Sequence, residues 1–189
     1  LTFDDGPWPG TTDAVLAALR HECVKASFFM LGRNAIAHPA LAKKVLADGH
    51  TVAYHTYSHP LLSRMSLPRA EAEIDRGFAA IDQAVYGSGS SSSTPKTPFF
   101  RFPGFASSPA LIALLAKRHI TVFGADLWAS DWNRMHPDHE RKLVLDRLRK
   151  THGGIVLFHD TQAQTARMLP ALLHDLKQQG YRVVHVAAR

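Results

Sequence analysis

The sequence is poor in cysteine and has no long apolar run. Its 189 residues include one cysteine, Cys23, which excludes a disulfide framework and a metal site built from several thiolates. No apolar stretch approaches the roughly 20 residues that a membrane-spanning helix needs, so we expect no transmembrane segment. The chain lacks an initiator Met and opens inside an apparent strand. We therefore expect a truncated N-terminus, with any signal peptide lying upstream of Leu1.

Acidic residues are outnumbered by basic ones, 16 against 22, which gives a formal net charge of +6. The lysines and arginines are scattered, mostly on the faces of predicted helices, and do not form one dense run. This pattern is typical of a solvated surface and argues against a nucleic-acid partner. Apolar residues make up 46% of the chain, which is enough for one globular domain spanning residues 1–189, and we expect a monomer.

Short apolar segments alternate with amphipathic ones along the whole chain. This alternation predicts a parallel sheet covered by helices, and the number of strands favours a distorted, incomplete (β/α) barrel of about seven strands. A low-complexity stretch from Gly87 to Pro98 predicts a flexible surface loop inserted within the domain. The expected strands are 1–3, 26–32, 51–54, 99–102, 120–123, 155–158 and 182–186. The expected helices are 11–20, 39–48, 67–85, 109–118, 137–150 and 165–179.

Two adjacent carboxylates, Asp4 and Asp5, end the first strand and are followed by Gly6-Pro7. Neighbours on a strand point to opposite faces, so the pair can share one site only where the strand ends and the chain turns. Carboxylates at the carboxyl end of a strand hold the usual position for chemistry in α/β folds. Taken alone, the stretch is more typical of a solvated turn.

A second stretch, His55-Thr56-Tyr57-Ser58-His59, places two histidines four residues apart. At this separation both side chains can bind one metal ion. Either Asp4 or Asp5 can add a carboxylate, which completes a two-histidine, one-carboxylate set. Such a set leaves coordination positions open for water and substrate, as a catalytic site requires.

Together, in this order, the two stretches resemble the NodB-type polysaccharide deacetylases, a family of metal-dependent carbohydrate esterases. Three later stretches also resemble motifs of that family, so the resemblance runs from Leu1 to His159. They are Phe100-Arg101-Phe102-Pro103-Gly104-Phe105, Asp126-Leu127-Trp128-Ala129-Ser130-Asp131-Trp132 and Ile155-Val156-Leu157-Phe158-His159-Asp160.

The resemblance implies different tasks for the two carboxylates. Asp5 would bind the metal with His55 and His59, while Asp4 would act as the general base. The implied metal is Zn²⁺, with Co²⁺, Mn²⁺ or Ni²⁺ as alternatives. Bound metal lowers the pKa of water from 15.7 to about 7 and polarises a carbonyl. The activity implied is hydrolysis of N-acetyl groups on a glycan that contains N-acetylglucosamine, in an extracytoplasmic compartment.

The resemblance also assigns roles to residues of the later motifs. Arg101 would hold Asp4 ionised and oriented, and its place between phenylalanines favours a buried, paired arginine. His159 would protonate the leaving amine, with Asp131 raising its pKa. Asp160 would point away from His159 and takes a lesser role.

The remaining implied residues would contact the substrate. A backbone N–H near Pro103-Gly104 would hold the oxyanion, and Trp132 and Leu157 would line a pocket for the acetyl methyl group. Gly104 stands where the family often has tyrosine, which leaves the groove wall formed by that aromatic in question. Phe105, which follows it, would stack on sugar rings with Phe102 and Trp132. Trp128 stands where many members have an aspartate. These departures leave the substrate open.

Three alternatives therefore remain: an O-acetyl esterase, a metal amidohydrolase acting on a small non-sugar amide, and an inactive carbohydrate-binding domain. The other histidines are expected to be non-catalytic, and His50, at the start of a predicted strand, is expected to be structural.

Overall fold

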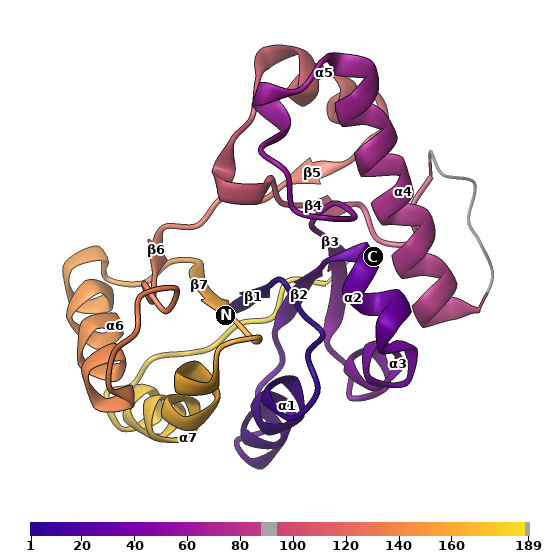
Figure 1. Ribbon diagram of the computed structural model, residues 1–189. Helices are drawn as coiled ribbons and strands as arrows, with labels where there is room; N and C mark the ends of the chain where they lie inside the picture. Colours follow the sequence, from indigo (N-terminus) through magenta and orange to yellow (C-terminus); the bar gives the residue numbers. More distant parts are fainter. Residues whose placement is uncertain (88–93, 188–189) are drawn as a thin grey trace.

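Seven parallel strands form one curved sheet with helices on its outer side (Figure 1). The computed structural model describes residues 1–87 and 94–187. The strand order is β5-β4-β3-β2-β1-β7-β6, and within the described residues β5 and β6 are the unpaired ends of the sheet. The predicted incomplete barrel is thus confirmed. The strands are β1 (Thr2–Asp4), β2 (Ser27–Met30), β3 (Thr51–Tyr54), β4 (Phe99–Phe100), β5 (Thr121–Val122), β6 (Leu127–Trp128) and β7 (Val156–His159).

The helices follow the strands in the alternating pattern that the sequence predicts. The longest, α4, buries Ile74, Phe78, Ile81 and Val85, which recur at helical spacing. None of the helices in the described part of the chain is long and apolar enough to cross a membrane. The helices are α1 (Thr11–His21), α2 (Gly32–Ala37), α3 (Pro39–Ala47), α4 (Leu67–Tyr86), α5 (Pro109–Lys117), α6 (Pro137–Thr151) and α7 (Ala163–Gln178), with short 3₁₀ turns η1 (Leu62–Arg64) and η2 (Pro103–Phe105).

The core lies between the central strands and their helices. Every residue of β1, β2 and β3 is buried, as expected for parallel strands covered by helices. Phe3 stacks between Phe28 and Phe158, with ring centroids 5.0 and 5.4 Å apart. This aromatic stack ties β1 to both of its neighbours, so the strand that ends in Asp4 has a firmly held position.

The register of the strands brings their carboxyl ends to one edge. Asp4 of β1 is opposite His159 of β7, and Tyr54 of β3 is opposite Phe100 of β4. His55 follows Tyr54 and Arg101 follows Phe100. Both residues therefore leave the sheet at the same edge. This convergence explains how motifs far apart in the sequence meet in one place.

The prediction of a strand at residues 182–186 is wrong. Those residues form no strand, and the carbonyl of Val186 accepts hydrogen bonds from the Thr51 and Ser27 hydroxyls, at 2.9 and 3.4 Å. Side chains rather than strand backbone therefore hold this segment. The seventh strand is instead β6, which pairs with β7. The short helix α2 was also not predicted, and part of the predicted surface loop, residues 88–93, lies outside the described residues.

Candidate active site

The backbone turn after β1 places both carboxylates on one side. Asp5 has a positive φ of 74°, a conformation that is uncommon for residues other than glycine and is often found at functional sites. Its carbonyl accepts a hydrogen bond of 2.7 Å from the Asn34 side chain. As a result the His55 Nε2 atom lies 3.7 Å from Asp4 Oδ2 and 3.6 Å from Asp5 Oδ1. The convergence expected of the pair is present.

Asp5, His55 and His59 form a cluster that fits a metal ion. One ligand atom from each lies within 4.8 Å of the others, and Asp5 Oδ1 is buried without a hydrogen-bond partner. His59 also has a positive φ, 68°, which turns its ring toward the cluster. A buried, unpartnered carboxylate oxygen is costly, and a cation between these three side chains would remove that cost.

His55 is held in the orientation that a metal ligand requires. Its Nδ1 atom lies 2.8 Å from the Arg101 carbonyl, so Nδ1 carries the hydrogen and Nε2 presents its lone pair to Asp5 and His59. Burial lowers the pKa of His55 to about 3. The imidazole is therefore neutral and free to bind a cation.

Arg101 is completely buried and contacts Asp4 directly. Its Nη1 atom donates to Asp4 Oδ1 at 2.7 Å and to Thr2 Oγ1 at 2.9 Å, and its Nη2 atom donates to the Gly124 carbonyl at 2.8 Å. Burial raises the pKa of Asp4, and the Arg101 charge opposes that rise. Arg101 thus fixes the direction of the carboxylate, while burial makes Asp4 a better proton acceptor than an exposed aspartate.

His159 faces the cluster from β7 and is paired with Asp131. Its Nδ1 atom lies 2.7 Å from Asp131 Oδ1, and its backbone N–H donates to Asp131 Oδ2, also at 2.7 Å. Burial alone would lower the pKa of His159, but Asp131, with Asp4 and Asp5, outweighs burial and raises it to about 9. The Nε2 atom lies 4.0 Å from Asp5 Oδ2. The imidazole is therefore a proton donor at the edge of the cluster.

These side chains open into a cavity of about 430 Å³. Three aromatic side chains on its rim are well exposed, with Trp132 53% and Trp128 and Phe105 each 42% accessible. Trp132 packs edge-on against the His159 ring, with centroids 6.0 Å apart. The lining consists of Asp4, Asp5, His55, His59, Phe102, Gly104, Phe105, Trp128, Trp132, Leu157, His159 and Gln162.

Pro103 is the one predicted substrate contact that the cavity lining does not include; it is the buried first residue of the η2 turn. Gln162, which the motifs did not indicate, is in the lining.

Asp160 is buried behind the site, where its Oδ2 atom accepts a 2.5 Å hydrogen bond from Thr12. A Cβ atom on Gly6 would lie 2.1 Å from that oxygen. A side chain at position 6 would therefore have to displace the buried Asp160 carboxylate.

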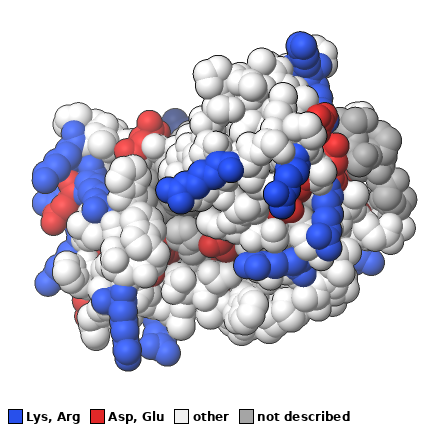
Figure 2. All heavy atoms as spheres, turned by 45° about the horizontal axis from the view of Figure 1, so that its top comes forward, with Lys and Arg blue, Asp and Glu red and all other residues white. Residues whose placement is uncertain are grey.

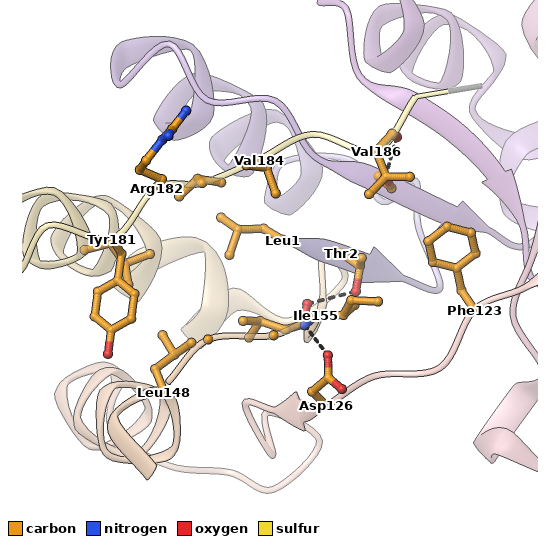
Figure 3. Close-up of a pocket in the computed structure, with 16 residues that line it drawn as sticks. Leu1, Thr2, Phe123, Asp126, Leu148, Ile155, Tyr181, Arg182, Val184 and Val186 are labelled. Atoms are coloured by element: carbon orange, nitrogen blue, oxygen red, sulfur yellow. Dashed lines mark hydrogen bonds between the residues drawn. The ribbon is translucent and has the colours of Figure 1, made fainter. Parts of the chain in front are cut away.

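A second cavity, of about 280 Å³, lies at the opposite end of β1 and is lined by Leu1, Thr2 and the segment after α7 (Figure 3). It contains none of the predicted site residues. On the face in Figure 2, the lysines and arginines of the described residues are spread over the surface, with acidic side chains among them. The chemistry-bearing side chains are thus concentrated in the first cavity.

A family model for polysaccharide deacetylase matches residues 1–123. The chain is 34% identical over 187 residues to peptidoglycan-N-acetylglucosamine deacetylase PgdA of Listeria monocytogenes, covering 98% of this chain and 37% of that protein. It is 31% identical to a chitooligosaccharide deacetylase of Bradyrhizobium sp., covering 97% of this chain and 86% of the relative. Among solved structures, the peptidoglycan deacetylase Bd3279 of Bdellovibrio bacteriovorus matches with a TM-score of 0.88 and 33% identity, covering 99% of this chain and 51% of that one.

Proposed function

This chain belongs to the polysaccharide deacetylase family, and from that premise we propose that it hydrolyses N-acetyl groups on a glycan that contains N-acetylglucosamine, releasing acetate. The family resemblance seen in the sequence is confirmed by the family model. Since the chain spans only 37% of the Listeria relative, the activity of any longer protein is part of the proposal. The observation that carries it is the cavity in which Asp4 and His159 both face the cluster of Asp5, His55 and His59.

The three clustered side chains are the proposed metal site. A divalent metal held by Asp5, His55 and His59 would polarise the acetyl carbonyl and lower the pKa of a water molecule. Nitrogen and carboxylate ligands suit Zn²⁺, and Co²⁺, Mn²⁺ or Ni²⁺ are the alternatives. Reconstitution of metal-free protein with each ion in turn distinguishes them by the rate of acetate release.

Asp4 is the proposed general base. Its Oδ1 atom is bound by Arg101, while its Oδ2 atom faces the cluster, so one oxygen is held and the other is available. The available oxygen takes a proton from the attacking water. The Arg101 contact fixes the direction of the carboxylate during that transfer.

His159 is the proposed general acid. With Asp131 on Nδ1, its Nε2 atom presents a proton to the cavity, and that proton passes to the leaving nitrogen as the carbon–nitrogen bond breaks. The first N–H groups of a helical turn lack partners within the turn, so the Gly104 N–H at the start of η2 is the proposed donor to the oxyanion.

The aromatic rim is the proposed glycan contact. Trp132 and Leu157 would enclose the acetyl methyl group, while Phe105 and Trp128 would pack against sugar rings. A cavity of about 430 Å³ is within the size range of small-molecule sites, and we propose that it takes one acetylated sugar of the glycan. Because the relatives are named for peptidoglycan and chitooligosaccharide, we propose an extracytoplasmic site of action.

The test is acetate release from chitin oligomers, peptidoglycan fragments and acetylated xylan, each with and without a chelator. Chelator-sensitive release from the first two supports N-deacetylation, and release from xylan alone indicates an O-acetyl esterase. Release that a chelator does not reduce contradicts the metal site. Absence of release from every glycan favours a small-amide hydrolase or an inactive binding domain.

A further inference from the structure

A chain of buried polar side chains runs from His159 into the protein interior. Asp131 contacts His159, and the Thr165 hydroxyl lies 2.8 Å from Asp131 Oδ2. The same hydroxyl lies 2.9 Å from Glu140 Oε1. Asp131, Thr165 and Glu140 are at most 1% exposed. They come from the segment after β6, from α7 and from α6, so the chain forms only where these elements pack together.

The Thr165 hydroxyl can hydrogen-bond fully to both acids only if one of the two acids is neutral. A hydroxyl group has a single proton, and an ionised carboxylate can only accept hydrogen bonds. Thr165 Oγ1 is within hydrogen-bond distance of one oxygen of Asp131 and one of Glu140. The Thr165 proton can serve only one of these contacts. The other contact therefore needs a proton carried by the second acid.

The surroundings assign that proton to Glu140. Asp131 already accepts from the His159 ring and from the His159 backbone N–H, so its charge is well supported. Glu140 has Thr165 as the partner of Oε1, while its Oε2 atom is buried without one. A buried carboxylate with an unpartnered oxygen is costly, whereas a neutral carboxylic acid is much less so.

Burial and the neighbouring Asp131 charge also favour the neutral form of Glu140. Burial raises the pKa of Glu140 to about 7; Asp131 adds to that rise, while Thr165 and His159 oppose it. The Asp131 anion, from the segment between β6 and α6, thus discourages a second negative charge beside it. His159 on β7 is farther from Glu140, because Asp131 and Thr165 lie between them in the series of contacts.

We propose that Glu140 is a neutral carboxylic acid and a positioning residue for His159, donating its proton to Thr165 so that the Thr165 hydroxyl donates to Asp131. This inference rests on the proposed role of His159 as general acid. Loss of the Glu140 proton turns the Thr165 hydrogen toward Glu140. Asp131 then loses a donor, and its hold on the His159 ring weakens.

The direct test is infrared difference spectroscopy of the metal-loaded protein against Glu140→Gln. At pH 6 the wild type should show the carbonyl band of a protonated carboxylic acid that the variant lacks, and the band should fade as the pH rises through about 7. Other buried acids cancel because both proteins contain them. The matched control is Glu22→Gln at the end of α1, where the pKa of the glutamate is lowered by Lys177 and His21, and no band should appear. Absence of the band with Glu140→Gln overturns the inference.

Kinetics supply a second test. Glutamine is a donor at every pH, so the ratio of kcat for Glu140→Gln to that of the wild type should rise with pH through about 7. A constant ratio overturns the inference. Thr165→Val should lower kcat about 10- to 100-fold with little change in KM, as for loss of a hydrogen bond to a charged group, and Thr165→Ser should restore it. Equal kcat values in the Val and Ser variants would contradict the proposed hydrogen bonds from Glu140 through Thr165 to Asp131.

The infrared test needs no turnover, so it separates this inference from the proposed function. A protonated Glu140 in a protein that releases no acetate leaves the inference standing and removes the function. Acetate release from a protein without the infrared band supports the proposed function and overturns the inference about Glu140.

Discussion

Arg101 Nη1 lies 2.7 Å from Asp4 Oδ1, and both side chains are almost completely inaccessible to water, 0% and 3% respectively. The two residues belong to the ends of β4 and β1, which are separated in the sheet by β2 and β3. The guanidinium crosses this gap over the Phe29 ring, 4.2 Å from its centroid. A buried charge pair that spans two intervening strands makes the position of Asp4 depend on the whole curved sheet.

Arg101→Met should leave Asp4 buried without its partner. Breaking a buried pair in this way costs about 3–5 kcal/mol, so urea denaturation should show a corresponding loss in the free energy of unfolding. The double variant Arg101→Met with Asp4→Asn should recover part of that loss, because no unpaired charge remains. Equal stability of the single variant and the wild type would contradict the buried pair.

Asp4→Asn should retain metal but lose turnover. Asparagine keeps the shape of the side chain and cannot take a proton, and a general base contributes about 10²- to 10⁴-fold to a rate. Acetate release should fall by that factor, while metal content by mass spectrometry stays unchanged. His55→Ala is the comparison and should lose metal. An Asp4→Asn protein with undiminished acetate release would remove Asp4 from its proposed role.

Gly77→Ala should push α4 away from the segment that carries both histidines. A Cβ atom at this position would lie 2.5 Å from the Thr56 carbonyl carbon, and backbone cannot yield as a flexible side chain can. A change from glycine to alanine normally stabilises a helix by about 0.5–1 kcal/mol. Because of the clash, we instead expect the free energy of unfolding to fall by about 1–3 kcal/mol.

Thermal or urea unfolding measures this loss, and equilibrium dialysis should show weaker metal binding. Ala79→Ser on the same helix is the control; it should lower stability by no more than about 0.5 kcal/mol through helix propensity and leave metal binding unchanged. Increased stability in Gly77→Ala would show that the segment moves freely.

His50 should make the protein sensitive to acid. Burial lowers the pKa of His50 to about 4 from 6.5, so the unfolded chain takes a proton between these values that the folded chain does not. Stability is complete above pH 6.5 and falls as the pH drops toward 4, by about 2–3 kcal/mol for this residue.

His50→Asn keeps an acceptor for the Ala26 N–H, which now bonds to His50 Nδ1 at 3.2 Å. The free energy of unfolding of this variant should change less between pH 7 and 5 than that of the wild type. An unchanged slope in His50→Asn would rule out His50 as the source.

The order of strands and helices could largely be predicted because it depends on local patterns. Short apolar runs marked six of the seven strands, and the helical spacing of Ile74 and Phe78 marked α4. A strand was wrongly predicted at residues 182–186 because the valines of this segment favour a strand. Its backbone lies where hydroxyls of Thr51 and Ser27 bind it instead. No local signal distinguishes it from β6, a strand of two residues.

By itself the sequence determined which reactive groups the proposed site contains: two carboxylates before a Gly-Pro turn, two histidines four apart, and Arg101, Asp131 and His159 in family order. Each of these is a matter of residue type and short spacing. Only the tertiary structure decided that Asp5 adopts φ 74° to face His55, and that Glu140 and Thr165 stand behind Asp131. Glu140 lies in the first turn of α6, where a sequence pattern indicates an ordinary surface acid. It is buried because α6 packs against α7, and such packing depends on contacts between distant segments that no local pattern encodes.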